Sequence, residues 1–434
     1  MVDAPPPTKR QKASAEAAAA AAPSLQEEIM RAATAPIARG TGRLRRSPVY
    51  ACHGMVSCSQ PLASEAGLRI LKSGGNAVDA AIAMAAALNV TTPTMTGLGG
   101  DMFMLYWDAK EKAVKALNGS GRSPAALTVE AVREAMGVDP QLHDGGMEYE
   151  GTAGVPDPKS IHCVTVPGSC AGWCDAIECW GSKSMADVLQ PAIELAAEGY
   201  PVAPVCAAMW DAASPSLSKW EHGAAAELLV QPADGSAPRA PGAGEIFTNP
   251  ALAESLREIA TGGKDAFYRG RVAERIVETV RKEGGTLTMD DMAAHSSEFV
   301  EALSMEYHGV ELWEHPPSGQ GITALIAANI LRSASTNVVG MEHGSTAHWH
   351  TLIEVLRLAF ADTRKYVADP TQADVPVGGL LSHEYGSKRA KLINPTAATA
   401  DVGAGTPLGA SDTVSFQVVD GEGNAVSMVN SVYI

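Results

Sequence analysis

The segment Ser411-Asp412-Thr413-Val414-Ser415-Phe416-Gln417-Val418-Val419, followed by Asp420-Gly421-Glu422-Gly423-Asn424, decides how the whole chain is interpreted. Val414, Phe416 and Val418 alternate with polar residues, which is the period of a half-buried strand. The next five residues have the composition of a turn. Ala425 to Tyr433 is a second β-prone run, so the sequence predicts a β-hairpin here.

A turn that is symmetric about Glu422 would place Thr413 opposite Ser431, with both hydroxyls on one face. A threonine hydroxyl is a weak nucleophile, and one base that can activate it is the residue's own α-amine. That amine exists only after the bond between Asp412 and Thr413 has been cleaved. One hypothesis is therefore an N-terminal nucleophile that self-cleavage exposes. The alternative is a structural Thr–Ser pair at a polar strand end, which is common in sheets.

The composition limits the classes of function. The 434 residues are enough for one large or two ordinary domains, and 46% hydrophobic residues are ample for a core. A formal charge of −16 argues against nucleic acid or an anionic membrane as the main partner. The seven cysteines form no C-x-x-C pair, which favours free buried thiols in a reducing compartment.

The domain organisation follows from shifts in composition. Residues 1–48 form an alanine- and proline-rich arm with eight Lys/Arg and four Asp/Glu, which predicts disorder. Residues 49–412 are expected to form the main domain, and 413–434 the start of a second part. The chain contains no run of eighteen apolar residues and no signal peptide, so we expect no membrane span and a cytoplasmic location.

Hydrophobic periodicity predicts the main elements. The helices expected here are 64–72, 76–88, 184–198, 252–260 and 271–281, and the strands are 102–107 and 114–117. A further helix is expected to bury the face formed by Trp349, Leu352, Ile353, Leu356 and Phe360.

Neither a cofactor nor a metal is expected. The Gly97–Asp101 loop precedes a strand and no Lys-Ser/Thr follows it, so it fits no nucleotide fingerprint and favours close backbone packing. His348 and His350 are two apart on the predicted helix, so they point in different directions and cannot share an ion.

Arg122 lies on the glycine-rich turn Asn118–Pro124. There it could present two parallel hydrogen bonds to a carboxylate, or it could be a surface arginine. No serine lies in a G-x-S-x-G elbow, and neither H-E-x-x-H nor a Walker loop occurs. Thr413 is therefore the best candidate nucleophile.

Motifs along the chain occur in an order that resembles the γ-glutamyltransferase family. They are 74–81 (GGNAVDAA), 97–101 (GLGGD), 166–168 (VPG), 191–196 (PAIELA), 267–270 (FYRG), 284–288 (GGTLT), 316–318 (PPS), Ala361-Asp362 to Asp369-Pro370, Thr413 and 420–426 (DGEGNAV). Each is weak alone, but the ordered set is specific, and it covers about residue 50 to the end.

The resemblance implies the fold of an N-terminal-nucleophile (Ntn) hydrolase, a four-layer αββα sandwich of the α/β (α+β) class with a helix-rich large subunit. Self-cleavage between Asp412 and Thr413 would yield large and small subunits that form a heterodimer. Thr413 would attack a γ-glutamyl amide such as glutathione and pass the glutamyl group to water or an amino acceptor. Ser431 matches a family hydroxyl that hydrogen-bonds the nucleophile.

The chain departs from the family pattern at its site. The family's arginine for the glutamate α-carboxylate falls on Ser120, so Arg122, two residues on, becomes the candidate. Tyr433 stands where a transferase places an asparagine, and Thr413-Val414-Ser415 replaces Thr-Thr-His. These differences lean toward the cephalosporin-acylase-like branch, which leaves an amidase or acylase as the alternative function.

The chain stops at Ile434, early in the family's small subunit. The resemblance implies that more of the sheet and a glycine pair of the oxyanion hole follow in complete members. Losing one oxyanion donor costs roughly 10²–10³ in rate. The sequence therefore also predicts an incomplete small-subunit sheet and a fragment that is inactive by itself, and it leaves open an inactive truncated homologue.

Overall fold

The computed structural model describes residues 49–135, 160–217, 224–399 and 413–431. These residues form two compact units. The larger unit comprises residues 51–302 together with the C-terminal hairpin, and the smaller unit comprises residues 303–399 together with Val49 and Tyr50. The predicted arm, residues 1–48, lies outside the described residues, and the predicted division between Asp412 and Thr413 stays a prediction.

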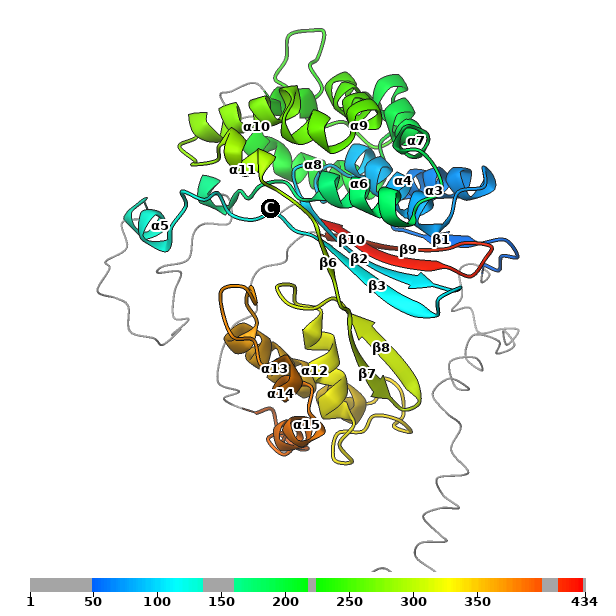
Figure 1. Cartoon of the computed structure of the whole chain (residues 1–434), viewed down its shortest axis with the longest axis vertical. Helices are drawn as coiled ribbons and strands as arrows, with labels where there is room; N and C mark the ends of the chain where they lie inside the picture. Colours follow the sequence, from blue (N-terminus) through cyan, green and yellow to red (C-terminus); the bar gives the residue numbers. More distant parts are fainter. Residues whose placement is uncertain (1–48, 136–159, 218–223, 400–412, 432–434) are drawn as a thin grey trace, which may run out of the picture. The chain divides into compact units, whose positions relative to one another are not determined.

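A six-stranded antiparallel sheet is the centre of the larger unit, with strand order β1-β9-β10-β2-β3-β6 (Figure 1). Its strands are β1 (Met55–Ser57), β2 (Asp101–Asp108), β3 (Ala113–Gly119), β6 (Glu298–Val300), β9 (Thr413–Val419) and β10 (Ala425–Ser431). The predicted strands at 102–107 and 114–117 and the predicted C-terminal hairpin are confirmed. The hairpin lies inside the sheet, between β1 and β2, because both of its strands have a partner on each side.

Helices cover one face of this sheet (Figure 1). The helices of the larger unit are α3 (Pro61–Lys72), α4 (Ala77–Thr91), α5 (Val129–Ala135), α6 (Ser169–Trp180), α7 (Met185–Glu198), α8 (Pro204–Leu217), α9 (Pro250–Tyr268), α10 (Arg271–Lys282) and α11 (Met289–Ala293), with 3₁₀ turns at Ile161–Cys163 and Ala224–Leu228. The short pair β4 (Tyr200–Pro201) and β5 (Ile246–Phe247) joins them. Helix α4 contacts both β9 and β10, and α6 contacts β2 and β3.

Helix α4 is the central helix, and every residue of it is buried. Asn76 caps its start, and Asp79 completes a capping box by accepting a hydrogen bond from the Asn76 backbone N–H. Its many alanines allow neighbouring backbones to approach closely. The neighbouring helix α3 contributes a small residue of its own, Gly67. A Cβ added there would lie 2.6 Å from the Met84 side chain of α4, so the two helices are in close contact at this point.

Asp420 joins the hairpin turn to the start of α4. One carboxylate oxygen accepts hydrogen bonds from the backbone N–H groups of Glu422 and Asn424, at 2.9 and 3.0 Å. The other oxygen accepts from the Ala77 backbone N–H at 3.1 Å. One buried side chain therefore satisfies both the turn and the N-terminus of the helix.

The smaller unit packs helices against a hairpin. Its elements are β7 (Leu303–Tyr307), β8 (Val310–Glu314), α12 (Ile322–Leu331), α13 (Thr346–Tyr366), α14 (Val377–Leu380) and α15 (His383–Ala390). Its core is centred on Ile326, Val355 and Leu358.

The buried face predicted for α13 is wrong. The helix forms, but Trp349, Ile353, Leu356 and Phe360 are all between 44 and 53% exposed. The opposite side is buried instead, and it includes two acidic residues. Asp362 pairs with Arg389 at 2.9 Å, and Glu354 pairs with Arg357 at 2.6 Å. These arginines make burial of the two carboxylates possible, and the hydrophobic periodicity of the helix does not reveal them.

Two other predictions need correction, and several elements were not predicted. Helix α9 extends beyond residue 260 to Tyr268 through a kink at Gly263, where φ is +58°. Helices α6 and α8 and the short strands β1 and β6 were not predicted. All seven cysteines are free, as expected, but Cys52 and Cys179 are exposed rather than buried.

None of the helices in the described ranges combines the length and apolar character that crossing a bilayer requires.

Candidate active site

Ser431 lies directly opposite Thr413 in the β9–β10 ladder, which confirms the pairing predicted from the turn. On its other side Ser431 lies opposite Asp101, the first residue of β2. Positions 413, 431 and 101 therefore form one row across three neighbouring strands, and neighbours within such a row have Cβ atoms about 5 Å apart.

The row lies on the sheet face that points away from the helices. Val414, Phe416 and Val418 of β9 and Met428 of β10 are buried beneath the helix layer. Ser427, four residues before Ser431 and hence on its side of the strand, is exposed, and Ser431 itself is half-buried. Asp412 and Tyr433 lie outside the described residues, so their predicted roles stay predictions.

Asp101 connects this row to the turn that follows β3. Its Oδ1 accepts a hydrogen bond from the Gly121 backbone N–H at 2.9 Å, and its Oδ2 accepts one from Ser120 Oγ at 3.2 Å. Burial raises the pKa of the Asp101 carboxyl above its ordinary value, although these two hydrogen bonds oppose the shift. Ser120 and Gly121 of the turn are therefore hydrogen-bonded to Asp101, the residue of β2 that lies opposite Ser431.

Three glycine-containing motifs meet at this turn. The Gly100 carbonyl accepts hydrogen bonds from the backbone N–H groups of Gly168 and Ser169, and the Arg122 carbonyl accepts one from Val166 N–H at 2.9 Å. A Cβ on Gly121 would lie 1.5 Å from the Val166 carbonyl oxygen, so only glycine fits there. The Gly97–Asp101 loop contacts this segment through the Gly100 carbonyl, but a Cβ added to Gly99 would meet no atom within 4 Å, so the close packing predicted for the loop does not extend to Gly99.

Arg122 extends from the same turn to β6. Its Nη2 pairs with Glu298 Oε1 at 2.5 Å, and both side chains are about half exposed, at 57 and 43%. Asn118 Nδ2 also donates to Glu298, at 3.4 Å. Because Glu298 offsets part of the guanidinium charge, holding a substrate carboxylate would require Arg122 to share or exchange this partner.

With this geometry described, the comparisons with known proteins identify the family. The gamma-glutamyltranspeptidase family profile matches residues 63–434. The chain belongs to the gamma-glutamyltranspeptidase family. It is 37% identical over 379 residues to the glutathione hydrolase-like YwrD proenzyme of Bacillus subtilis, a match that covers 87% of this chain and 66% of that protein. It is 32% identical over 393 residues to the acylase ACY 1 proenzyme of a Pseudomonas strain, covering 89% and 66%.

Solved structures place the chain in the same gamma-glutamyltranspeptidase group of Ntn hydrolases. A cephalosporin acylase from Bacillus halodurans superimposes with a TM-score of 0.74 at 40% identity, covering 92% of this chain and 69% of that one. The γ-glutamyltranspeptidase of Helicobacter pylori gives a TM-score of 0.69 at 28% identity, covering 82% and 95%. The chain spans about two thirds of the length of the curated relatives named above, 66% in each case. The expected Ntn-hydrolase fold is confirmed.

Asp101 is the residue of this candidate site that the sequence did not predict. The sequence marks it only as the end of a glycine loop. The signal that could have drawn attention to it is an acidic residue at the first position of a strand that neighbours the hairpin carrying Thr413. That neighbour relationship depends on strand order, which the sequence pattern does not contain.

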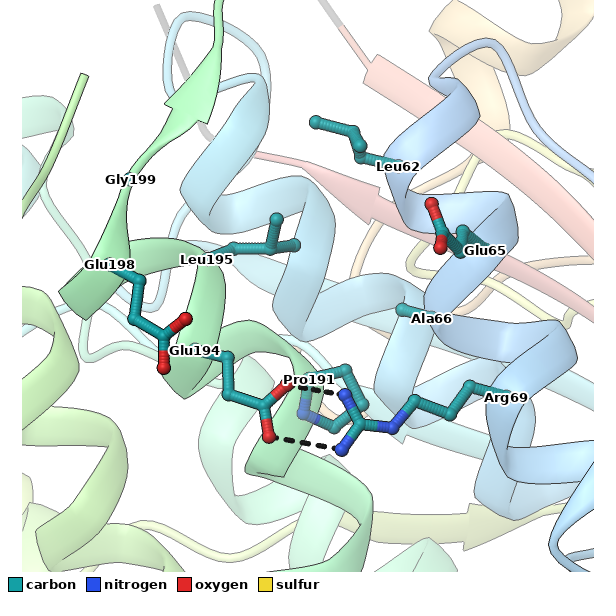
Figure 2. A pocket seen from close by; sticks show the side chains of 9 residues that line it. All are labelled: Leu62, Glu65, Ala66, Arg69, Pro191, Glu194, Leu195, Glu198 and Gly199. Carbon is teal, nitrogen blue, oxygen red and sulfur yellow. Dashed lines mark hydrogen bonds and ion pairs between the residues drawn. The ribbon is translucent and has the colours of Figure 1, made fainter. Parts of the chain in front are cut away.

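A pocket of about 220 Å³ elsewhere in the larger unit does not belong to this site. It is lined by residues of α3 and α7 together with Gly199 (Figure 2). Across it Arg69 forms a two-pronged ion pair with Glu194, one bond of which measures 3.0 Å. None of its lining residues comes from β2, β9 or β10, so this pocket is not a candidate binding site for a substrate of Thr413.

Proposed function

We propose that this chain is the precursor of a γ-glutamyl hydrolase or transferase, with Thr413 as the nucleophile after cleavage between Asp412 and Thr413. The observation that carries the proposal is the position of Thr413. It is the first residue of an internal strand and lies opposite Ser431, in a chain of the gamma-glutamyltranspeptidase family. The relatives named above are called proenzymes, which agrees with activation by cleavage.

The cleavage step follows from the chemistry of threonine. The Thr413 hydroxyl attacks the Asp412 carbonyl carbon, the peptide C–N bond breaks, and the nitrogen takes up the hydroxyl proton to become the Thr413 α-amine. Water then hydrolyses the resulting ester, which releases the Asp412 carboxylate and restores the hydroxyl. The two products, residues 1–412 and the chain from Thr413 onward, would remain associated as large and small subunits because β9 and β10 are internal strands of the sheet.

The catalytic step uses the new amine as the base. It takes the hydroxyl proton while the oxygen attacks the γ-carbonyl carbon of the substrate, and the proton is then given to the departing amine. The acyl group on Thr413 is transferred to water, which is hydrolysis, or to an amino acceptor, which is transfer. In this scheme the Ser431 hydroxyl hydrogen-bonds the Thr413 oxygen and holds it in line for attack.

An acylase acting on another γ-carboxyl amide is the second candidate. Ser120 occupies the position that would hold an arginine in the transferase pattern, and Arg122 already pairs with Glu298. Both facts weaken recognition of a glutamate α-carboxylate. The 40% identity to a cephalosporin acylase points the same way. Glutathione and glutaryl amides are therefore the two substrate classes to compare.

Intact-mass measurement of the purified chain tests the nucleophile. We expect the wild-type chain to yield fragments that separate between Asp412 and Thr413, and Thr413→Ala to stay intact. Wild-type and Thr413→Ala chains that both remain whole after prolonged incubation would refute the proposal. Hydrolysis of γ-glutamyl and glutaryl anilides then separates the substrate classes, because an acylase should strongly prefer the glutaryl compound.

A further inference from the structure

The carboxylate of Asp101 occupies a position that neither the cleavage step nor the acyl transfer uses. It lies on β2 at the end of the row formed by positions 413, 431 and 101. Met102, the next residue, is buried beneath the helices, so Asp101 points to the other face of the sheet, as Ser431 does. Backbone pairing thus places a carboxylate beside the residue that is proposed to orient the nucleophile.

Both oxygens of the same carboxylate accept hydrogen bonds from the turn after β3. One oxygen accepts from Gly121 N–H and the other from Ser120 Oγ, at 2.9 and 3.2 Å. A hydrogen bond to an ionised group is stronger than one between neutral groups. Breaking this pair of bonds would remove the attachment of Ser120 and Gly121 to the start of β2.

The turn is also held at points that do not involve β10. Its Arg122 carbonyl bonds to Val166, and its Arg122 side chain bonds to Glu298 on β6. Asp101 is the attachment on the side of Ser431. Its loss would therefore change the distance between Ser431 and Arg122 even if the other two attachments remained.

We infer that Asp101 is a positioning residue of this site. By bonding Ser120 and Gly121 it holds the turn that carries Arg122 in register with the strand end that carries Ser431. The inference rests on the proposed function for its consequence, since Ser431 and Arg122 matter for chemistry only if Thr413 is the nucleophile. The physical link itself, from Asp101 to both segments, can be tested without any activity.

The first test is hydrogen exchange, followed by mass spectrometry, on the 434-residue chain. We expect Asp101→Ala to speed exchange about tenfold in peptides that cover 118–122, because the Gly121 N–H loses its charged acceptor. Exchange should also rise in peptides that cover 428–431, because the end of β10 pairs with the strand position that no longer holds the turn. Asp101→Asn should have a much smaller effect, since its amide oxygen can accept from Gly121 and its NH₂ can donate to Ser120. Asp108→Asn is the matched control, an acid at the other end of β2 that accepts from Lys110 and Glu111 N–H, and it should leave both peptides unchanged.

The second test is the rate of cleavage between Asp412 and Thr413. A displacement of about 1 Å can cost on the order of a hundredfold in rate, so Asp101→Ala should slow cleavage by about 10- to 100-fold. Asp101→Asn should restore it to within about threefold of wild type. Should Asp101→Ala fail to fold, Ser120→Ala removes one of the two bonds from the turn's side and should reproduce part of both effects.

The outcomes separate the inference from the proposed function. Faster exchange in 118–122 alone, with 428–431 and the cleavage rate unchanged, would overturn the inference, because Asp101 would then hold only the turn. An Asp101→Asn variant as slow as Asp101→Ala would overturn it too, since the charge rather than the bond geometry would be required. A wild-type chain that never cleaves refutes the proposed function, whereas the exchange experiment still decides whether Asp101 links the two segments.

Discussion

Ser431 and Thr413 face each other across the β9–β10 ladder, eighteen residues apart in sequence and adjacent in the sheet. The turn that brings them together is held by Asp420, which also bonds the first backbone N–H of α4. The position of the proposed nucleophile therefore depends on the hairpin and on the helix beneath it.

Replacing Ser431 tests the role assigned to this pairing. We expect Ser431→Ala to slow cleavage at Thr413 by about 100-fold, the lower end of the roughly 10²–10³ lost with one oxyanion donor, because Ser431 is proposed to bond the nucleophile rather than the developing oxyanion. Thr413→Ser should retain cleavage because it keeps the hydroxyl. Ser427→Ala, an exposed serine on the same strand, is the control, and a Ser431→Ala chain that cleaves as fast as this control would contradict the role.

Asp79 should contribute strongly to stability. It is fully buried and accepts hydrogen bonds from Asn76 N–H at 2.8 Å, Ser182 Oγ at 2.6 Å and Ser182 N–H at 3.0 Å. Asp79→Ala leaves these donors without a partner, so the free energy of unfolding should fall by about 2–3 kcal/mol in urea titrations. Asp187→Ala, which removes an exposed acid in the first turn of α7, should cost clearly less, and equal losses would show that burial is not the cause.

Gly121 should tolerate no side chain. In Gly121→Ala the new Cβ would lie 1.5 Å from the Val166 carbonyl oxygen, so the turn must move. Overpacking of this kind costs about 1–3 kcal/mol, and displacement of Arg122 should accompany it. In Gly99→Ala the new Cβ meets no atom within 4 Å, which makes this variant the control for thermal unfolding. Matching melting temperatures for the two variants would count against the packing described here.

The raised pKa of Asp101 predicts a pH dependence with a definite sign. The folded chain keeps the Asp101 proton to a higher pH than the unfolded chain does, where the pKa is about 3.9. The free energy of unfolding therefore falls as pH rises from the unfolded pKa through the folded one. Because asparagine does not titrate, Asp101→Asn should gain stability relative to wild type across this window, as urea titrations at several pH values would show.

Asp108 provides a control of opposite sign. Hydrogen bonds, first from Glu111 N–H and then from the Lys115 side chain, lower the pKa of its carboxyl. Its contribution to stability is present above the unfolded pKa and is lost as pH falls through the folded pKa. Asp108→Asn should therefore lose stability relative to wild type as pH rises. Identical pH trends for the two variants would contradict the assigned burial of Asp101.

Local patterns were sufficient for the hairpin and for the start of α4. Alternation of apolar and polar residues predicted which side of β9 is buried, and the composition of 420–424 predicted the turn and hence the pairing of Thr413 with Ser431. Asn76 and Asp79 likewise lie within four residues of each other, so their capping box is written in consecutive sequence. A capping box joins residues of a single helical turn, so it depends only on local backbone geometry, which the order of the residues specifies directly.

Residue order alone determined the register of the β9–β10 hairpin, the alternation of its buried side and the cap of the helix below it. Tertiary structure decided which strand lies next to Ser431, and so brought Asp101 into the row and gave its carboxylate partners nineteen and twenty residues away. It also decided which side of α13 is buried, because Arg389 makes burial of Asp362 possible while Trp349 stays exposed. The physical reason is that a polar group's preference for burial depends on the partners that folding brings to it, and a hydrophobic period records none of them.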